Sequence, residues 1–485
     1  MFTIQNLIHN QLTGAAGGET LEVYEPATGQ VYASAPRSRS EDAQRAVASA
    51  RSAFQDWQAL TPEVRCDYLL RIAEGIEKCG DELAAAESRD NGKPLHLARS
   101  LDIPRAAQNF RFFATALLHA SQEVHARPGF LNYTLGKPLG VGVCISPWNL
   151  PLYLLSWKIA PALAAGNCVV AKPSEVTPLT AHYLAEIVIE AGLPPGVLNL
   201  VHGLGAEIGQ ALCEHEQVAA ISFTGSTRTG KSIALQAAGS FKKVSLEMGG
   251  KNAALIFADA YEHEATRQSL METVLKSSFV NQGQVCLCTS RLLIEASVYE
   301  AFKADFVAAV KGLTVGDPQQ ESTDQGAVVS KEHQQKILGC LKKAREEGGV
   351  FLTGGNPVTL AGRCENGYFV EPTVIEGLGP ETCTNTEEIF GPVVTLQPFD
   401  NETESVALAN ATDYGLAASL WTRDSGRIQR LSQQIEAGVL WVNTWMARDL
   451  RTPFGGLKNS GVGREGGWYA TNFWTEPRNV CIAEL

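Results

Sequence analysis

The chain has 485 residues, more than one hydrophobic core usually organises, so we expect two or more lobes. Apolar residues make up 45% of the sequence and charged residues 19%, which is typical of a folded globular protein and excludes a disordered one. The net charge of −12 argues against nonspecific binding to nucleic acid or to an anionic membrane.

The cysteine content and the first residues bear on location. Eleven cysteines, an odd number scattered through the chain, fit a reducing compartment better than a disulfide framework. The opening sequence MFTIQNLIHNQLTG has no basic segment followed by an apolar run and a small-residue cleavage site. We therefore expect a cytoplasmic protein with neither a membrane nor a nucleic acid as partner.

The chain opens with a helical layer and continues with a sheet. Apolar residues recur at helical spacing over 41–57, about 62–90 and 103–120. From Leu139 onward, segments of helix length alternate with short β-rich runs, which are GVGVCI, CVVAKP, GVLNLV, AAISFTG and KKVSLEMGG. This alternation predicts a doubly wound parallel sheet.

A second cycle of the same kind follows the Gly-Gly pair at 249–250. Helices near 261–280 and 298–310 lie among the β-rich runs AALIF, RLLIEA, VVTLQPF and GVLWVN. The expected fold class is therefore α/β, with two doubly wound parallel-sheet lobes that divide near residues 249–251.

Three turns in the first lobe could hold a nucleotide. GLGAEIG (203–209) follows a strand but misses the G-x-G-x-x-G spacing by one residue, and FTGSTRTG (223–230) is a second strand, Gly-Ser turn and helix. KPSE sets Lys172 and Glu175 at the carboxyl edge of the sheet, where such folds bind nucleotides. A carboxylate there can accept both ribose hydroxyls and would repel a 2′-phosphate, which favours NAD over NADP. Plain surface turns are the alternative.

Two polar residues fit acyl chemistry. Asn149, in SPWN before an apolar helix, could stabilise an oxyanion together with a backbone N–H, although a helix cap is the alternative. Glu247, in LEMGGKN, ends a strand, and burial there would raise its pKa and suit it to act as a general base. A solvated glutamate at a strand end is the competing interpretation.

The stretch NQGQVCLCTSR (281–291) places Cys286 and Cys288 two positions apart. A metal site is not expected, because neither a second close cysteine pair nor a histidine pair at ligand spacing occurs in the chain. Backbone geometry does not favour a disulfide across one residue. We favour one nucleophilic thiol beside a packed neighbour.

The ordered set of motifs resembles that of the aldehyde dehydrogenases over nearly the whole chain. The set is SPWN, KPSE, FTGS, LEMGGKN, GQVC, EEIFGPV at 387–393 and PFGGLKNSGVGRE at 453–465. That family is similar to a Rossmann fold but binds NAD without the G-x-G-x-x-G fingerprint. The resemblance also implies a small β oligomerisation arm, and hence a homodimer or homotetramer. The implied divisions are an NAD-binding lobe (1–120 and 140–248), a catalytic lobe (249–440), a crossing segment that lines the active site (441–469) and the arm (121–139 and 470–485).

The resemblance implies roles for particular residues. Cys286 would attack the aldehyde carbon, with the alkoxide held by the Asn149 side chain and the Cys286 N–H. After hydride transfer to the cofactor NAD, Glu247 would deprotonate the water that hydrolyses the thioester. Glu465 matches a position that assists proton transfer. The cofactor contacts implied by the resemblance are Ile145, Trp148, Lys172, Glu175, Gly209, Phe223, Gly225 and Ser226, with Glu388 and Phe390 at the nicotinamide ribose.

Arginines indicate the class of aldehyde. Arg448 and Arg451 come just before PFGG, and Arg105 lies in DIPRAAQNF. Guanidinium groups that face a pocket grip carboxylates with paired hydrogen bonds, so an acidic aldehyde is expected. Surface arginines paired with Asp102 or Asp449 are the alternative.

These segments resemble the branch of the family that oxidises 2-aminomuconate and 2-hydroxymuconate 6-semialdehydes. Arg105 and Arg448 would then bind the substrate carboxylate, while Trp157 and Phe454 would line the path by which the aldehyde enters. The LCTSR ending favours the amino compound, with the hydroxy compound or a broader range of aldehydes as alternatives. A cysteine hydrolase is disfavoured because no histidine belongs to a recognisable partner motif, and a non-catalytic NAD-binding protein is the remaining alternative.

Overall fold

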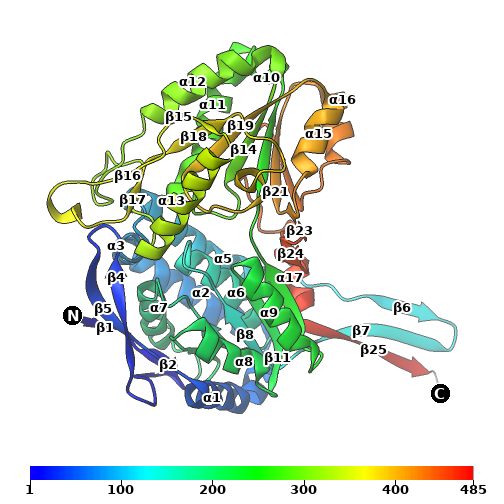
Figure 1. Ribbon diagram of the computed structural model, residues 1–485. Helices are drawn as coiled ribbons and strands as arrows, with labels where there is room; N and C mark the ends of the chain where they lie inside the picture. The colour runs from blue at the N-terminus through cyan, green and yellow to red at the C-terminus, as the bar shows by residue number, and fades with distance from the viewer. Residues whose placement is uncertain (484–485) are drawn as a thin grey trace.

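The computed structural model describes residues 1–483, which form two α/β lobes and a β arm that leaves the body (Figure 1). The predicted fold class, with two parallel-sheet lobes, is confirmed. Within residues 1–483, no helix is both long enough and apolar enough to cross a membrane.

The first lobe is built on an eight-stranded sheet of order β24-β12-β11-β8-β9-β10-β2-β3. Its central strands are parallel and buried on both faces, which accounts for their continuous apolar sequence. The short edge strands β2, β3 and β24 are antiparallel to their neighbours. The strands are β2 (Asn6–Ile8), β3 (Gln11–Thr13), β8 (Val141–Ile145), β9 (Cys168–Lys172), β10 (Leu198–Leu200), β11 (Val218–Thr224), β12 (Lys243–Glu247) and β24 (Gly461–Val462).

Helices cover both faces of this sheet (Figure 1). The predicted helix over 62–90 is two helices, because Cys79 leaves helical geometry between them. A separate small sheet of β1 (Phe2–Thr3), β4 (Thr20–Glu25) and β5 (Gln30–Pro36) was not predicted. The helical segments of the first lobe are α1 (Ser40–Ala59), α2 (Pro62–Lys78), α3 (Gly80–Asn91), α4 (Leu95–Leu97), η1 (Ala98–Asp102), α5 (Ile103–Leu118), α6 (Pro151–Ala164), α7 (Leu179–Glu190), η2 (Gly205–Gly209), α8 (Gln210–Glu214) and α9 (Thr227–Ala238).

The second lobe has a seven-stranded sheet of order β15-β18-β19-β14-β13-β21-β22, parallel except for β15. Its strands are β13 (Asn252–Ile256), β14 (Thr289–Glu295), β15 (Val350–Thr353), β18 (Thr373–Glu376), β19 (Val393–Phe399), β21 (Ala417–Trp421) and β22 (Val439–Val442). Short pairs are β16 (Pro357–Val358) with β17 (Phe369–Val370), and β20 (Tyr414–Gly415) with β23 (Leu457–Lys458). The helical segments are α10 (Ala258–Tyr261), α11 (Glu264–Phe279), η3 (Val280–Gly283), η4 (Ala296–Val298), α12 (Tyr299–Lys311), α13 (Lys331–Glu346), η5 (Gly362–Cys364), α14 (Cys383–Thr386), α15 (Glu402–Asn410) and α16 (Ser425–Ser432).

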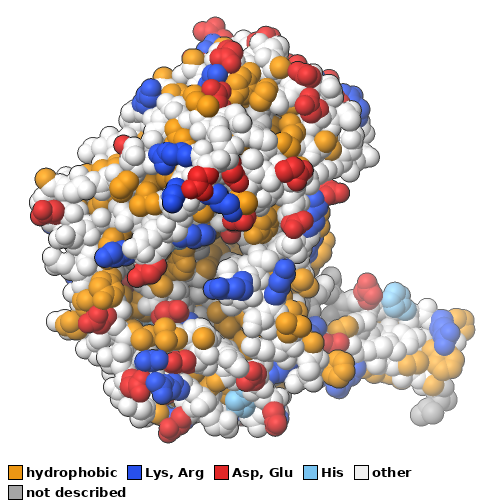
Figure 2. Space-filling view, in the orientation of Figure 1, with side chains coloured by type: hydrophobic (Ala, Val, Ile, Leu, Met, Phe, Trp, Pro, Cys, Tyr) orange, Lys and Arg blue, Asp and Glu red, His pale blue; other side chains and the backbone are white. Residues whose placement is uncertain are grey.

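The arm is a three-stranded antiparallel sheet of β6 (Val124–Arg127), β7 (Phe130–Pro138) and β25 (Thr475–Ala483). Its last strand begins later than the predicted arm segment 470–485. The helix α17 (Gly467–Phe473) precedes it, and Ala470 and Trp474 pack into the core of the first lobe. The last two residues of the predicted segment lie outside the described residues. Apolar side chains are exposed along the arm (Figure 2), namely Val124, Phe130, Leu131 and Ile482.

Candidate active site

The centre of the first sheet offers a crevice. The chain moves from β8 through β9 to β10 on one side, and then returns to place β11 on the other side of β8. The loops that follow β8 and β11 therefore diverge, and such a switch point is where open α/β sheets bind ligands. The surface is hollowed between the two lobes on the face shown in Figure 2.

A pocket of about 200 Å³ lies at this point and takes residues from both lobes. Asn149 and Cys286, the predicted oxyanion residue and nucleophile, both line it. The other lining residues are Pro147, Trp148, Thr224, Gly225, Ser226, Met248, Gly249, His333, Lys336, Glu388 and Phe390. The structure thus brings the two predicted catalytic residues together with five of the predicted cofactor contacts.

The remaining predicted cofactor contacts lie at the same sheet edge but outside this pocket. Lys172 ends β9, and its Nζ donates to Glu175 Oε2 at 3.0 Å. A Cβ built on Gly209 would stand 3.6 Å from the Lys172 Cδ, so the lysine stem passes directly over that glycine. Phe223 lies under Gly225 with its ring in the space a side chain there would need, and Ile145 ends β8.

The loop that carries Cys286 is held from several sides. Asn281, Gln282 and Gly283 all have positive φ, and a Cβ on Gly283 would collide with the Gly391 carbonyl. Asn252 Nδ2 donates to the carbonyls of Cys286 and Cys288 at 2.7 and 2.9 Å. The loop is therefore fixed in a conformation that regular secondary structure does not supply.

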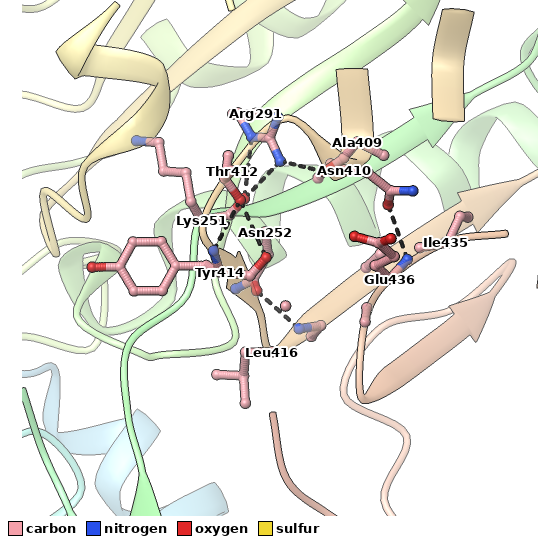
Figure 3. Close-up of a pocket in the computed structure, with 15 residues that line it drawn as sticks. Lys251, Asn252, Arg291, Ala409, Asn410, Thr412, Tyr414, Leu416, Ile435 and Glu436 are labelled. Carbon is pink, nitrogen blue, oxygen red and sulfur yellow. Dashed lines mark hydrogen bonds between the residues drawn. The ribbon is translucent and has the colours of Figure 1, made fainter. Parts of the chain in front are cut away.

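Hydrogen bonds of Arg291 hold the segment that contains Asn252 in place (Figure 3). The Arg291 guanidinium donates to the Lys251 carbonyl at 3.1 and 2.9 Å, and to the carbonyls of Leu408 and Ala409. Asn252 Oδ1 accepts from the Ala417 N–H at 3.0 Å. These contacts fix the start of β13, and through Asn252 they fix the carbonyls of the cysteine loop.

The two cysteines differ in environment. Cys288 is buried in an apolar cluster with Leu150 and Leu287, as expected for the packed neighbour. Cys286 is partly exposed to the pocket, and burial raises the pKa of its thiol to about 12, with Glu388 and Glu247 adding to the rise. The thiol is protonated at neutral pH in this arrangement, so a base must take its proton before it can attack.

Glu247 is the residue predicted from the sequence to be the general base. It ends β12 in a buried position, and neither carboxylate oxygen has a hydrogen-bond partner among the described residues. Burial first and Glu465 second raise its pKa well above the usual range, against the opposing charges of Lys158, Arg464 and Arg448. A raised pKa is a property that suits a carboxyl group to act as a general base.

Glu465 is held differently. It accepts hydrogen bonds from Trp157 Nε1 at 2.7 Å, Lys158 Nζ at 2.8 Å and Ser222 Oγ at 3.1 Å. Trp157, predicted as a wall of the aldehyde's path, is thus buried and engaged with this carboxylate. The charge of Glu465 raises the pKa of the neighbouring Glu247.

The far wall of the pocket comes from the second lobe. Glu388 Oε1 accepts from the Gly250 N–H at 2.9 Å, and a Cβ on Gly249 would collide with the Glu388 carboxylate. His333 Nε2 donates to the Phe390 carbonyl at 2.7 Å, and Phe390 has a φ of 60°. Burial lowers the pKa of His333 to about 4, so its ring is neutral.

Sequence reasoning missed several of these supporting residues. His333 and Lys336 lie on α13, far from the 387–393 motif in sequence, and Lys336 Nζ donates to the Glu388 carbonyl at 3.2 Å. Their helix has the polar composition of an ordinary surface helix, so no local signal marks them. Asn252 lay inside a quoted motif, and its position directly after Gly-Gly-Lys could have suggested a role.

A second groove, of about 410 Å³, contains the predicted substrate arginines. Arg105 and Arg448 both line it, and over residues 1–483 neither has a carboxylate within salt-bridge distance. Asp449 pairs instead with Arg451 at 2.6 Å, and Asp102 pairs with the buried Lys93. The structure therefore excludes the alternative in which Asp102 or Asp449 occupies these two arginines.

Arg448 rests on aromatic rings. Its guanidinium carbon lies 4.0 Å from the ring centre of Phe454 and 5.4 Å from that of Trp157. Arg105 lies 5.7 Å from the ring centre of Tyr153. Phe454 and Trp157 are both buried and line neither cavity, so they support Arg448 from beneath.

Comparison with known proteins agrees with this geometry. Residues 13–480 match the aldehyde dehydrogenase family. The chain is 47% identical over 466 residues to 2-aminomuconic semialdehyde dehydrogenase of Bos taurus, with 95% of each protein covered. It is 44% identical over 489 residues to 2-hydroxymuconic semialdehyde dehydrogenase of Pseudomonas sp. (strain CF600), covering 99% of this chain and 100% of that protein. It superimposes on the NAD+ complex of an aldehyde dehydrogenase from Bacillus cereus with a TM-score of 0.95 at 36% identity, covering 99% and 96% of the two chains.

The class of protein is now established. The chain belongs to the aldehyde dehydrogenase family, which confirms the resemblance inferred from the ordered motifs. It is an oxidoreductase, and both curated relatives described above are named for muconic semialdehydes.

Proposed function

We propose that the protein oxidises an acidic semialdehyde to the carboxylate with NAD as the acceptor, and that 2-aminomuconate 6-semialdehyde is the substrate. The observation that carries the substrate class is the pair Arg105 and Arg448, two guanidinium groups that line one groove and have no carboxylate partner among residues 1–483. The names of relatives 47% and 44% identical support a muconic semialdehyde. The second candidate is 2-hydroxymuconate 6-semialdehyde, supported by the Pseudomonas relative.

The pocket residues fit NAD. The Gly225 turn leaves no room for a side chain, and Ser226, which caps α9 by accepting from the Thr229 N–H at 3.2 Å, lines the pocket beside it, so a pyrophosphate could approach the start of this helix. Glu175, about one-third exposed, offers a carboxylate at the end of β9 for ribose hydroxyls. The residues that would hold the cofactor are Ile145, Trp148, Lys172, Glu175, Gly209, Phe223, Gly225, Ser226, Glu388 and Phe390. When bound, NAD accepts the hydride from the aldehyde carbon.

The catalytic residues divide the remaining work. Cys286, deprotonated by Glu247, adds to the aldehyde carbon and leaves a negative charge on the oxygen. The Asn149 amide and the Cys286 N–H stabilise that charge. Once the carbon is oxidised, Cys286 carries a thioester, and Glu247 takes a proton from the water that hydrolyses it. The raised pKa of Glu247 makes it a stronger base for both proton transfers, and Glu465 adds to that rise.

The assembly and location are also proposals. The arm leaves the body and exposes apolar side chains on its strands, which suits pairing with a second copy of the chain in a homodimer or homotetramer. The reduced state of all cysteines within residues 1–483 suits a cytoplasmic protein.

The test follows NADH formation by its absorbance with 2-aminomuconate 6-semialdehyde, its hydroxy analogue and a neutral aliphatic aldehyde. We expect the acidic compounds to be preferred, and Cys286→Ala to abolish turnover while the protein still binds NAD. Turnover by the alanine variant would contradict the nucleophile. Equal kcat/KM for the neutral aldehyde would contradict the acidic substrate.

A further inference from the structure

A buried lysine lies beside the active site but outside the motifs discussed above. The helix α3 ends at Asn91, and Gly92 follows with a φ of 85°, which turns Lys93 into the protein. The Lys93 side chain is completely buried, as are the two carboxylates that it contacts. Its Nζ lies 3.0 Å from Asp102 Oδ2, 3.4 Å from Glu87 Oε1 and 3.1 Å from the Asn149 carbonyl oxygen.

This cluster is expensive to bury. Removing a lysine and two carboxylates from water carries a desolvation cost that their mutual attraction offsets only when the geometry is good. Burial raises the pKa of Glu87 to about 8 and also raises that of Asp102, and one oxygen of each carboxylate has no partner among the described residues. Because an apolar cluster of similar volume often stabilises a fold as well, stability alone does not account for this lysine, and its other contacts bear on its role.

Lys93 also contacts the backbone of Asn149. The carbonyl oxygen of Asn149 accepts from Lys93 Nζ at 3.1 Å, Asn281 Nδ2 at 3.0 Å and Asn91 Nδ2 at 3.3 Å. Its side-chain amide donates to the Gln284 carbonyl at 2.9 Å. Three donors on one peptide oxygen restrict rotation of that peptide, and the side chain attached to it is held from its own backbone.

The same turn also reaches the cysteine loop. The Gly92 carbonyl accepts from the Ala327 N–H at 3.0 Å, and the Ala327 carbonyl accepts from Gln282 Nε2 at 2.6 Å. A Cβ on Gly92 would stand 2.6 Å from the Ala327 oxygen, so the approach requires glycine. One tight turn therefore contacts Asn149 directly and the loop that carries Cys286 through Ala327.

We propose that Lys93, assisted by Asn91, is a positioning residue that holds the Asn149 amide in register with the Cys286 N–H. The inference rests on the proposed function, in which Asn149 stabilises the oxyanion. Lys93 does not touch the substrate and acts only through the Asn149 peptide.

The test is a double-mutant cycle with Lys93→Met, Asn149→Ala and the double variant. Loss of an oxyanion donor costs about 100- to 1000-fold in kcat, and that is the loss expected for Asn149→Ala. Misplacement of the donor should lower kcat of Lys93→Met about 10- to 100-fold. KM for the aldehyde, NAD affinity by fluorescence and the rate of Cys286 alkylation by iodoacetamide should change by less than about threefold, since a positioning role touches none of them. The double variant should be no slower than Asn149→Ala alone, within about threefold.

A matched control is Lys242, a second buried lysine, which donates to the carbonyls of Cys213 and His215 away from the site. Lys242→Met should leave kcat unchanged. If Lys93→Met does not fold because two carboxyl groups are left unpaired, the cycle is run with Lys93→Met combined with Glu87→Gln and Asp102→Asn. Asn91→Leu, which removes one donor without a change of charge, should show a smaller loss that also disappears in the Asn149→Ala background.

The outcomes separate the two ideas. If Asn149→Ala keeps kcat within threefold of the unaltered protein, the proposed oxyanion role fails and the positioning role fails with it. If Asn149→Ala is slow, the oxyanion role stands. The positioning role is then overturned in either of two cases: Lys93→Met or Asn91→Leu does not lower kcat, or the loss of kcat it causes is as large in the Asn149→Ala background as in the unaltered protein.

Discussion

Replacement of the groove arginines tests the substrate class most directly. Arg448→Met keeps the aliphatic stem on Phe454 and removes the guanidinium. A hydrogen bond to a charged group contributes about 1.5–3 kcal/mol, and the groove is open to solvent, so we take the lower value of about 1.5 kcal/mol for each arginine. At 1.4 kcal/mol for each factor of ten, Arg448→Met or Arg105→Met should lower kcat/KM for the acidic semialdehyde about tenfold.

The comparison with a neutral aldehyde removes other effects of the substitution. Arg448 opposes the rise in the pKa of both Cys286 and Glu247, so its loss should also lower turnover of neutral aldehydes, whereas Arg105 is not among the main charges that act on either group. The quantity to measure is therefore the ratio of kcat/KM for the acidic aldehyde to kcat/KM for a neutral aldehyde of similar length. Initial rates of NADH formation give both constants in one assay.

Arg451 is the matched control, because it lines the same groove but its guanidinium forms an ion pair with Asp449. Arg451→Met should leave the ratio unchanged within about twofold, since the Arg451 guanidinium is already paired with Asp449 and exposed ion pairs contribute little. The reasoning is refuted if the ratio is the same in Arg448→Met, Arg105→Met and the unaltered protein. It is equally refuted if Arg451→Met lowers the ratio as much as they do.

Three further substitutions test Glu247, Gly249 and Gly142. Glu247→Gln should lower turnover about 100-fold or more and abolish the rise of activity with pH, because only the ionised carboxylate is a base and its pKa is raised. The same raised pKa means that the ionised form is disfavoured in the fold, so unfolding measurements should show the unaltered protein losing stability relative to Glu247→Gln as pH climbs. Gly249→Ala should displace the Glu388 carboxylate and lower kcat about 10- to 100-fold, while denaturant unfolding changes by less than about 0.5 kcal/mol; a large loss of stability would contradict this. Gly142→Ala should lower the free energy of unfolding by about 1–3 kcal/mol because the new methyl group meets the Trp474 ring, and an unchanged midpoint would show that the ring can move.

The catalytic centre was predictable where it depends on local pattern. Asn149, Gly225 and Glu247 each follow or end a strand whose apolar sequence is easily recognised, and parallel strands deliver their carboxyl ends to one edge. The position of Cys286 relative to that edge depends on how the two lobes pack against each other. From the sequence, only the family resemblance indicated it. The assignments of roles to these residues remain predictions.

Other features depend on contacts that no sequence window contains. Lys93 follows a helix-ending glycine, a place where lysine is normally solvated, and its burial depends on Asp102 and Glu87 arriving from either side. Which arginine is paired was left open by the sequence, since Asp449 lies one residue from Arg448 and two from Arg451. In the structure, the turn brings Asp449 against Arg451, whose backbone N–H and side-chain Nε both donate to the Asp449 carboxylate.

The charges near Cys286 explain why it matters that Asp449 pairs with Arg451 and not with Arg448. Glu388 and Glu247 both raise the pKa of the Cys286 thiol, and Glu465 in turn raises the pKa of Glu247. A negatively charged substrate brought to such a site would be repelled unless cations intervened. Arg448 lies on the side of the groove, opposes the rise at both Cys286 and Glu247, and has no carboxylate of its own within residues 1–483. An arginine already neutralised by a neighbouring aspartate would do neither, so under the proposed function Arg448 would both recognise the acid and favour the thiolate of Cys286.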